Sequence, residues 1–100
     1  MQISISARHG SISDLTREKI ESKVSKLQRF FERIQAIEVT VDLETRENPL
    51  VDIQLTTEHR KTFVVQTQSG ELFVSLDEGI HKLEQQIKKY KEKLCDRRPE

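Results

Sequence analysis

Basic side chains recur at helical spacing in two parts of this sequence. Between residues 14 and 34 a lysine directly precedes each of three apolar residues, in the pairs Lys19-Ile20, Lys23-Val24 and Lys26-Leu27. Neighbouring residues of an α-helix are about 100° apart, so these lysines form a stripe beside the apolar face. Near the C-terminus the same position is held by Lys82, Lys89 and Lys93. Ammonium groups in such stripes can bind the phosphates of a polyanion such as RNA.

Lysine-rich helix flanks are also common as plain solvated surfaces, and lysines in a last helical turn favour the helix dipole. One stripe alone therefore indicates no function. The formal net charge is +0, but residues 1–34 hold seven basic and four acidic side chains. Residues 35–80 hold three basic and nine acidic side chains, and residues 81–100 hold seven and four. A neutral protein with such segregated charge can present one positive face to RNA.

Catalytic and metal-binding chemistry has little support in the pattern. His9, His59 and His81 are expected in two turns and a helix, without the spacing of metal ligands. Cys95 is the single cysteine and cannot form an internal disulfide, which favours a reducing, cytoplasmic location. No apolar run approaches the roughly 18 residues that a membrane span needs. We expect a protein that is not an enzyme and has no metal, no cofactor, no small-molecule substrate and no membrane contact.

The positions of these residues depend on helices and strands that the hydrophobic pattern predicts. Alternating apolar and polar residues predict strands around Ile3–Ala7, Ile37–Leu43, Val51–Leu55 and Phe63–Thr67. A first helix is predicted from Asp14, with Ser13 or Asp14 as its cap, to about Ile34. Its expected apolar face is Ile20, Val24, Leu27, Phe31 and Ile34. A second helix is predicted from Glu71 to about Leu94, and Gly79 inside it suggests close packing.

This order, β-α-β-β-β-α, predicts an α+β fold with two helices packed on one face of a four-stranded mixed sheet. The first strand should lie parallel to the second through a right-handed crossover, and the other strands should form an antiparallel meander. The open sheet face is expected to carry Gln2, Glu38, Asp42, Glu44, Asp52 and Gln54. Among the aromatic residues, Phe31, Phe63 and Phe73 are expected in the core, and Phe30 and Tyr90 are the plausible exposed platforms for bases.

Nearly the whole chain resembles the bacterial ribosome hibernation factors, the family of hibernation promoting factors and ribosome-associated inhibitors. The N-terminal half carries the resemblance in Met1-Gln2-Ile3-Ser4-Ile5, Ile12-Ser13-Asp14, Lys26-Leu27 and Phe31-Glu32-Arg33-Ile34. The C-terminal half carries it in Leu76-Asp77, Lys82-Leu83, Gln86-Ile87 and Lys89-Tyr90-Lys91-Glu92-Lys93-Leu94. The usual Asp-Met-Tyr of the family is Glu71-Leu72-Phe73 in this chain.

The resemblance implies a fold like that of double-stranded-RNA-binding domains. It also implies docking in the decoding channel of the small ribosomal subunit, where the protein inhibits translation as part of a stress response. Matching RNA-binding positions are Arg17, Lys23, Lys26, Arg33, Lys82, Lys89, Lys91 and Lys93. Periodicity alone adds Lys19, Arg29 and Lys88. We expect one ribosome-binding domain over residues 1–95, a short basic tail over residues 96–100, and a likeness to the short form of the family.

If the two helices lie side by side, their basic flanks are expected to merge into one positive surface that contacts ribosomal RNA. The alternative is a protein-interaction module that receives a protein partner on its acidic open sheet face or on an edge strand.

Overall fold

In a computed structural model the chain forms four strands and three helices, and residues 2–30, 33–45, 47–58 and 61–96 are described. The elements are β1 (Gln2–Arg8), α1 (Asp14–Ser25), α2 (Leu27–Phe30), β2 (Ile34–Asp42), β3 (Leu50–Thr57), β4 (Thr62–Gln68) and α3 (Leu72–Asp96). With α1 and the short α2 taken together, the order is the expected β-α-β-β-β-α.

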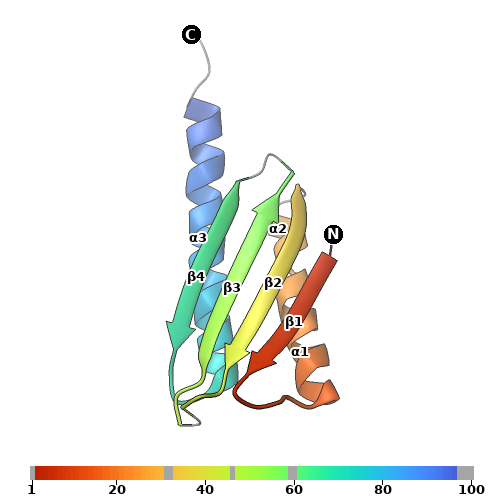
Figure 1. The fold of residues 1–100 in the computed structure, drawn as a ribbon. Coiled ribbons are helices and arrows are strands. Elements are labelled where there is room, and N and C mark those ends of the chain that lie inside the picture. The colour runs from red at the N-terminus through yellow and green to blue at the C-terminus, as the bar shows by residue number, and fades with distance from the viewer. Residues whose placement is uncertain (1, 31–32, 46, 59–60, 97–100) are drawn as a thin grey trace.

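The four strands form one mixed sheet in the order β1-β2-β3-β4 (Figure 1). β1 is parallel to β2, with Ile5 opposite Val39, and the helical segment between them makes the crossover. β2, β3 and β4 are antiparallel, so that Val39, Ile53 and Val65 lie in one row across the sheet. The topology predicted from the sequence is confirmed.

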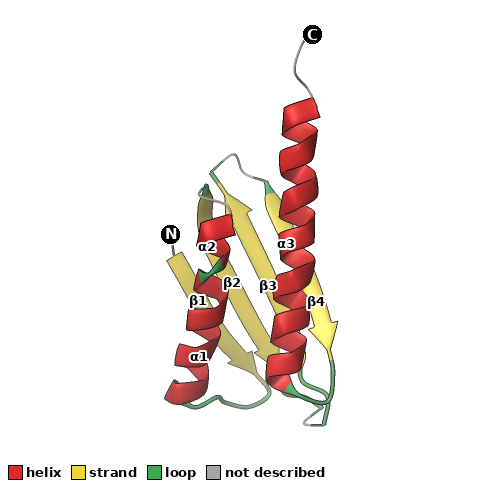
Figure 2. Cartoon of the chain, turned by 180° about the vertical axis from the view of Figure 1, so that it is seen from behind, coloured by secondary structure: helices red, strands yellow, loops and turns green. Residues whose placement is uncertain are grey.

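All three helices cover the same face of the sheet, and the opposite face is open (Figure 2). The core lies between these two layers. From the helices it takes Ile20, Val24, Leu27, Leu76, Leu83 and Ile87, and from the sheet chiefly Ile37, Val39, Val41, Val51, Ile53, Leu55, Phe63 and Val65. The last turns of α3 reach beyond the end of the sheet. Among the described residues no helix is long and apolar enough to cross a membrane.

The prediction that the first helix continues to about Ile34 is wrong. α1 begins as expected, since the Ser13 hydroxyl accepts a hydrogen bond from the Thr16 amide at 3.1 Å, but it ends at Ser25. The Ser25 hydroxyl donates to the Ser22 carbonyl at 2.9 Å, and such local bonds compete with regular helix. A single turn, α2, follows, and Ile34 is buried as the first residue of β2, opposite Thr57. The expected core residue Phe31 lies outside the described residues.

The prediction of α3 is confirmed to within two residues at each end, and Gly79 lies in close contact with the sheet. A Cβ atom at Gly79 would lie 2.9 Å from Ile53 Cδ1 and 3.4 Å from Thr67 Oγ1. Gly79 is thus placed where α3 crosses β3 and β4, which confirms the close packing inferred from its position inside the helix.

We predict that Gly79→Ala will not stabilise the protein, although alanine is favoured over glycine by up to about 1 kcal/mol within a helix. The added methyl group overpacks the contact with Ile53, and overpacking typically costs about 1–3 kcal/mol. Urea unfolding measures the free energy. In an Ile53→Val background, which removes the opposing Cδ1 atom, Gly79→Ala should become stabilising; equal stabilisation in both backgrounds would contradict the contact.

Candidate nucleic-acid interface

The basic flank of α1 faces α3. Lys19 Nζ lies 5.9 Å from the centroid of the Phe73 ring, and Lys23 Nζ lies 3.0 Å from Asp77 Oδ1. We call this contact region, formed by Lys19, Lys23, Phe73 and Asp77, the α1–α3 seam. Lys26 is exposed one heptad after Lys19, and so lies on the same side of the helical segment. Three of the expected lysines therefore line the side of α1 that is turned toward α3.

The corresponding basic flank of α3 faces the other way, toward β4. On this flank Thr67 Oγ1 of β4 donates to the Ser75 carbonyl at 2.5 Å, and Gly79 packs beside Thr67 and Val65. Lys82 and Lys89 follow Ser75 by one and two heptads and are both exposed. We call this flank, which consists of Ser75, Gly79, Lys82, Gln86 and Lys89, the β4-side flank.

The direction of the helices explains why these basic flanks do not meet. α1 and α3 run in the same direction over the same sheet face (Figure 2). The flank that precedes the apolar stripe therefore points the same way in both helices, toward α3 in α1 and toward β4 in α3. The expected single merged surface is replaced by two groups of cations on the two sides of α3.

The other expected RNA-binding residues lie around these groups. Lys91 follows Asp77 by two heptads, so it lies on the flank of α3 that is turned toward α1, and it is exposed. Arg17 lies on the far side of α1, where its guanidinium donates to the Ile5 carbonyl of β1. Arg33 is exposed just before β2, and the side chain of Lys93 lies outside the described residues. The role of each residue in RNA binding stays a prediction.

Lys61 lies beside Lys89 on the β4 side of α3 and is absent from the expected set. Its Nζ atom lies 5.6 Å from the Phe63 ring centroid and 6.0 Å from that of Tyr90. The two rings meet edge to face, with their centroids 5.6 Å apart. The sequence places Lys61 in an acidic stretch, and only the pairing of β4 with α3 brings it beside Lys89. Tyr90, expected as an exposed platform, is half-buried; Phe63 is buried and Phe73 half-buried.

These side chains enclose a hollow of about 310 Å³ at the edge of the sheet. We call it the β4–α3 hollow; it is lined by residues 61–64 and by Gln86, Lys89 and Tyr90. Among these described lining residues two are cationic and none is acidic.

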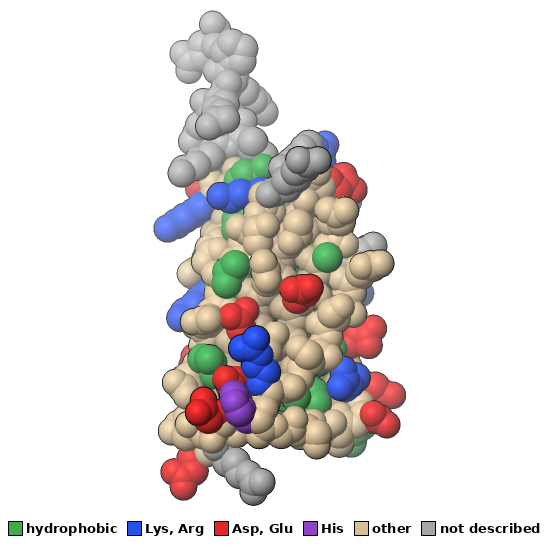
Figure 3. Space-filling model, viewed as in Figure 1, with side chains coloured by type: hydrophobic (Ala, Val, Ile, Leu, Met, Phe, Trp, Pro, Cys, Tyr) green, Lys and Arg blue, Asp and Glu red, His purple; other side chains and the backbone are tan. Residues whose placement is uncertain are grey.

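The open face of the sheet is mostly uncharged, with separate acidic and basic side chains (Figure 3), and the acidic residues expected there include Glu38, Asp42 and Asp52. Glu38, Asp42 and Asp52 line a shallow hollow of about 330 Å³ together with Arg8. Gln66 Nε2 donates to Asp52 Oδ2 at 2.8 Å across β3 and β4. The helices also carry exposed carboxylates, among them Glu18, Glu21, Asp77, Glu78 and Glu92, so the cations are concentrated on particular flanks and do not cover the whole helix layer.

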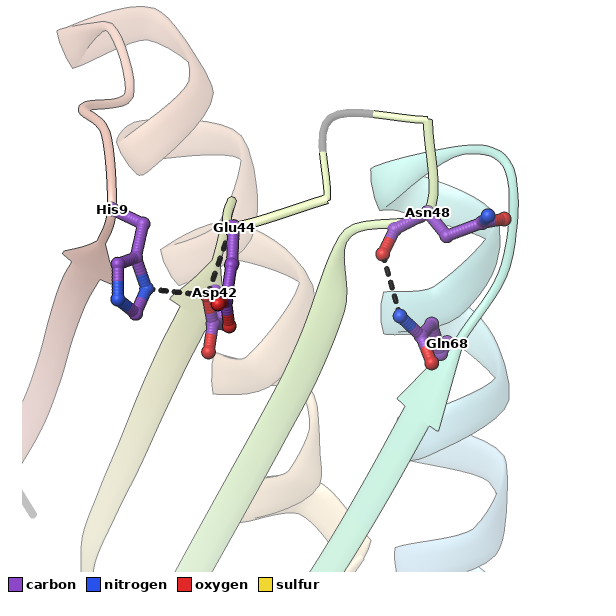
Figure 4. A network of polar contacts seen from close by, with 5 residues as sticks. All are labelled: His9, Asp42, Glu44, Asn48 and Gln68. Carbon is purple, nitrogen blue, oxygen red and sulfur yellow. Dashed lines mark hydrogen bonds and ion pairs between the residues drawn. The ribbon is translucent and has the colours of Figure 1, made fainter.

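One cluster at the end of β1 and β2 was not foreseen. His9 Nδ1 lies 2.9 Å from Asp42 Oδ1, and the Glu44 amide donates to the same oxygen at 3.0 Å (Figure 4). These contacts hold the pKa of Asp42 below its ordinary value, chiefly through the Glu44 amide and then through His9. One ligand atom each from His9, Asp42 and Glu44 lies within 4.8 Å of the others, although exposed groups of this kind are common without a metal. Nearby, Gln68 Nε2 donates to the Asn48 carbonyl at 2.8 Å.

Comparison with known proteins agrees with the resemblance seen in the sequence. The family model described as Sigma 54 modulation protein / S30EA ribosomal protein matches residues 3–95. Ribosome hibernation promoting factor of Azotobacter vinelandii is 28% identical over 97 residues, which cover 97% of this chain and 89% of the relative. Ribosome hibernation promotion factor of Staphylococcus aureus (strain COL) is 29% identical over 85 residues, 84% of this chain and 45% of that relative.

Two solved structures share the fold. A ribosomal subunit interface protein from Coxiella burnetii superimposes with a TM-score of 0.81 at 27% identity, covering 91% of this chain and 98% of that one. The N-terminal domain of Protein Y from Thermus thermophilus gives a TM-score of 0.78 at 23% identity, with 90% and 99% coverage, and shows the fold alone.

We predict that the stabilising effect of Asp42 will depend on pH. Its folded-state pKa is lowered from 3.8, so ionised Asp42 stabilises the fold above that value, and the effect is lost as the pH falls through the lower folded-state pKa. Wild type should therefore unfold at higher urea than Asp42→Asn near neutral pH, and this difference should close below about pH 4. A difference that is the same at neutral and acidic pH would contradict the contacts drawn in Figure 4.

Proposed function

The chain belongs to the Sigma 54 modulation protein / S30EA ribosomal protein family, and from this membership we propose that it is a ribosome hibernation factor that inhibits translation. Its partner is the small ribosomal subunit, which it meets in the cytoplasm. It acts by occupying the decoding channel, so that messenger and transfer RNA are excluded, and no bond is made or broken. Residues 1–95 are the ribosome-binding unit.

The observation that carries this proposal is the concentration of exposed lysines on particular flanks of the helices. Lys26, Lys82, Lys89 and Lys91 are exposed on the helix layer, whereas Glu38, Asp42 and Asp52 lie on the open sheet face. A polyanion is attracted to these lysine-rich flanks and repelled by the carboxylates of the sheet face. The names of the Azotobacter vinelandii and Coxiella burnetii relatives, a ribosome hibernation promoting factor and a ribosomal subunit interface protein, support the ribosome as that polyanion.

Binding to ribosomal RNA phosphates predicts a strong dependence on salt. If about six phosphates are neutralised, the affinity for purified small subunits should fall roughly a thousandfold between about 50 and 200 mM salt. Co-sedimentation across this range measures the affinity, and crosslinking locates the contacted RNA. Binding that is indifferent to salt would contradict phosphate recognition.

We predict that neutralising one helix-layer lysine lowers the slope of log affinity against log salt by about one. Lys82→Gln, Lys89→Gln and Lys91→Gln test the two sides of α3 separately. The matched control is Gln54→Glu, which changes the net charge by the same amount on the open sheet face. If the slope decreases equally in the control and in the lysine variants, the effect comes from net charge, and a helix-layer interface is contradicted.

Removal of the Asp77 charge should strengthen RNA binding, in contrast to the lysine variants. Asp77 neutralises Lys23 across the α1–α3 seam, with 37% of the Lys23 side chain and 58% of the Asp77 side chain exposed. We predict that Asp77→Asn raises the affinity for small subunits at low salt and steepens the salt slope by about 0.9, because it leaves one more cation for phosphate. Stability should change little, as exposed pairs contribute about 0–1 kcal/mol. Weaker binding by this variant would show that the pair itself shapes the interface.

A second candidate is a protein-interaction module, favoured by the hollow that Glu38, Asp42 and Asp52 line on the open sheet face. Glu38→Gln combined with Asp52→Asn separates the two functions. If this variant binds small subunits normally but no longer inhibits translation, a protein partner on the sheet face is required.

A further inference from the structure

The β4–α3 hollow combines two chemistries, cationic groups and aromatic rings, around one open depression. Lys61 and Lys89 supply cationic groups, while Phe63 and Tyr90 supply aromatic surface on the same wall. The aromatic pair also holds Lys61, since the ammonium group lies over both rings. An ammonium group held in this way loses less freedom on binding than a lysine that projects into solvent.

The lining of the hollow mixes polar and apolar residues. Val64 of β4 also lines the edge of the hollow; because it alternates with the buried Phe63 and Val65, its side chain points to the open sheet face, and the residue is 51% exposed. Gln86 adds an amide that can donate and accept hydrogen bonds. The volume of about 310 Å³ is at the lower end of the range of small-ligand sites.

We propose that the β4–α3 hollow binds one unpaired nucleotide of a single RNA strand. The base contacts Tyr90 and the apolar wall, and the adjoining phosphates contact Lys61 and Lys89. This inference rests on the proposed function, and it adds a site that recognises a base to a surface that otherwise recognises phosphates. Single-stranded RNA is commonly bound by this combination of cations and aromatic rings.

An acidic peptide is the competing occupant, and the lining of the hollow disfavours it. Carboxylates would pair with Lys61 and Lys89, but they would make no use of the aromatic surface of Tyr90. A nucleotide fills both parts, because its flat base and its phosphate are joined within one ligand.

The composition of the chain allows a direct test. Tyr90 is the only tyrosine and there is no tryptophan, so the intrinsic fluorescence of the protein reports this residue alone. A base that stacks on a tyrosine ring quenches its emission. A short single-stranded uridine oligomer should therefore quench the fluorescence, whereas an abasic oligomer with the same number of phosphates should bind without quenching. Free tyrosine amide in the same solutions corrects for light absorbed by the bases.

The affinities give a second readout. Since base stacking on an aromatic side chain is worth about 1–3 kcal/mol, the uridine oligomer should bind about 5- to 150-fold tighter than the abasic oligomer. Tyr90→Leu should abolish this ratio, and Lys61→Gln should weaken both oligomers. Lys82→Gln, one heptad before Lys89 and outside the hollow, is the matched control and should keep the ratio. Circular dichroism checks that each variant is folded.

Each contrary outcome overturns a defined statement. Equal binding and equal fluorescence with the two oligomers would overturn the nucleotide site. Quenching by a glutamate-rich peptide but not by RNA would assign the hollow to an acidic protein partner. Uridine monophosphate binding as tightly as the oligomer would make the hollow a small-molecule site instead of an RNA-strand site. If the oligomer quenches Tyr90 fluorescence but the chain does not co-sediment with small subunits, the nucleotide site is supported and the ribosomal function is contradicted. If the chain co-sediments but the oligomer does not quench Tyr90 fluorescence, only the nucleotide site is contradicted.

Discussion

The arrangement of charge in this protein depends on one constraint, the parallel direction of α1 and α3 on a single sheet face. The parallel pairing of β1 and β2 requires a crossover, so α1 must run against β1, and α3 runs against β4 in the same way. When two helices run in the same direction over the same surface, the residues that precede the apolar stripe lie on the same side of each helix. The lysines that precede each apolar stripe therefore face one direction, and one group lies between the helices while the other lies beside β4.

This constraint separates two kinds of cation. In the α1–α3 seam, Lys19 and Lys23 face Phe73 and Asp77, so they take part in packing one helix against the other. On the β4-side flank, Lys89 meets a sheet edge, where an aromatic pair and Lys61 complete a hollow. A lysine already paired with a carboxylate has less to gain from a phosphate, because the first pair must be broken. The β4-side flank is therefore better suited than the seam to contact RNA directly.

The strands, their order and α3 could be predicted because each has a single strong periodicity. The hydrophobic pattern is ambiguous at Ile34, because this residue continues the helical spacing of Leu27 and also begins the alternation of β2. In the structure Ile34 is buried in the strand, opposite Thr57. Sequence spacing identified the flank of each helix, but the direction in which a flank faces depends on how the helices lie together. Lys61 beside Tyr90, and His9 beside Asp42, were missed because strand pairing and layer packing bring them together from distant parts of the chain.

A surface made only of phosphate contacts would bind many RNA segments with similar strength, since phosphates carry no sequence information. Selection of one place on a ribosome requires either a matching shape or contacts with particular bases. The separation of the cations into two groups allows recognition of RNA shape, because the two groups can contact RNA backbone that passes on both sides of α3. In the binding mode that we propose, the β4–α3 hollow adds a place for a base next to one of these groups. Because it lies at an edge of the sheet, it leaves the carboxylates of the open sheet face turned away from the RNA, so attraction to the lysine-rich flanks and repulsion by these carboxylates favour a single orientation of the bound protein.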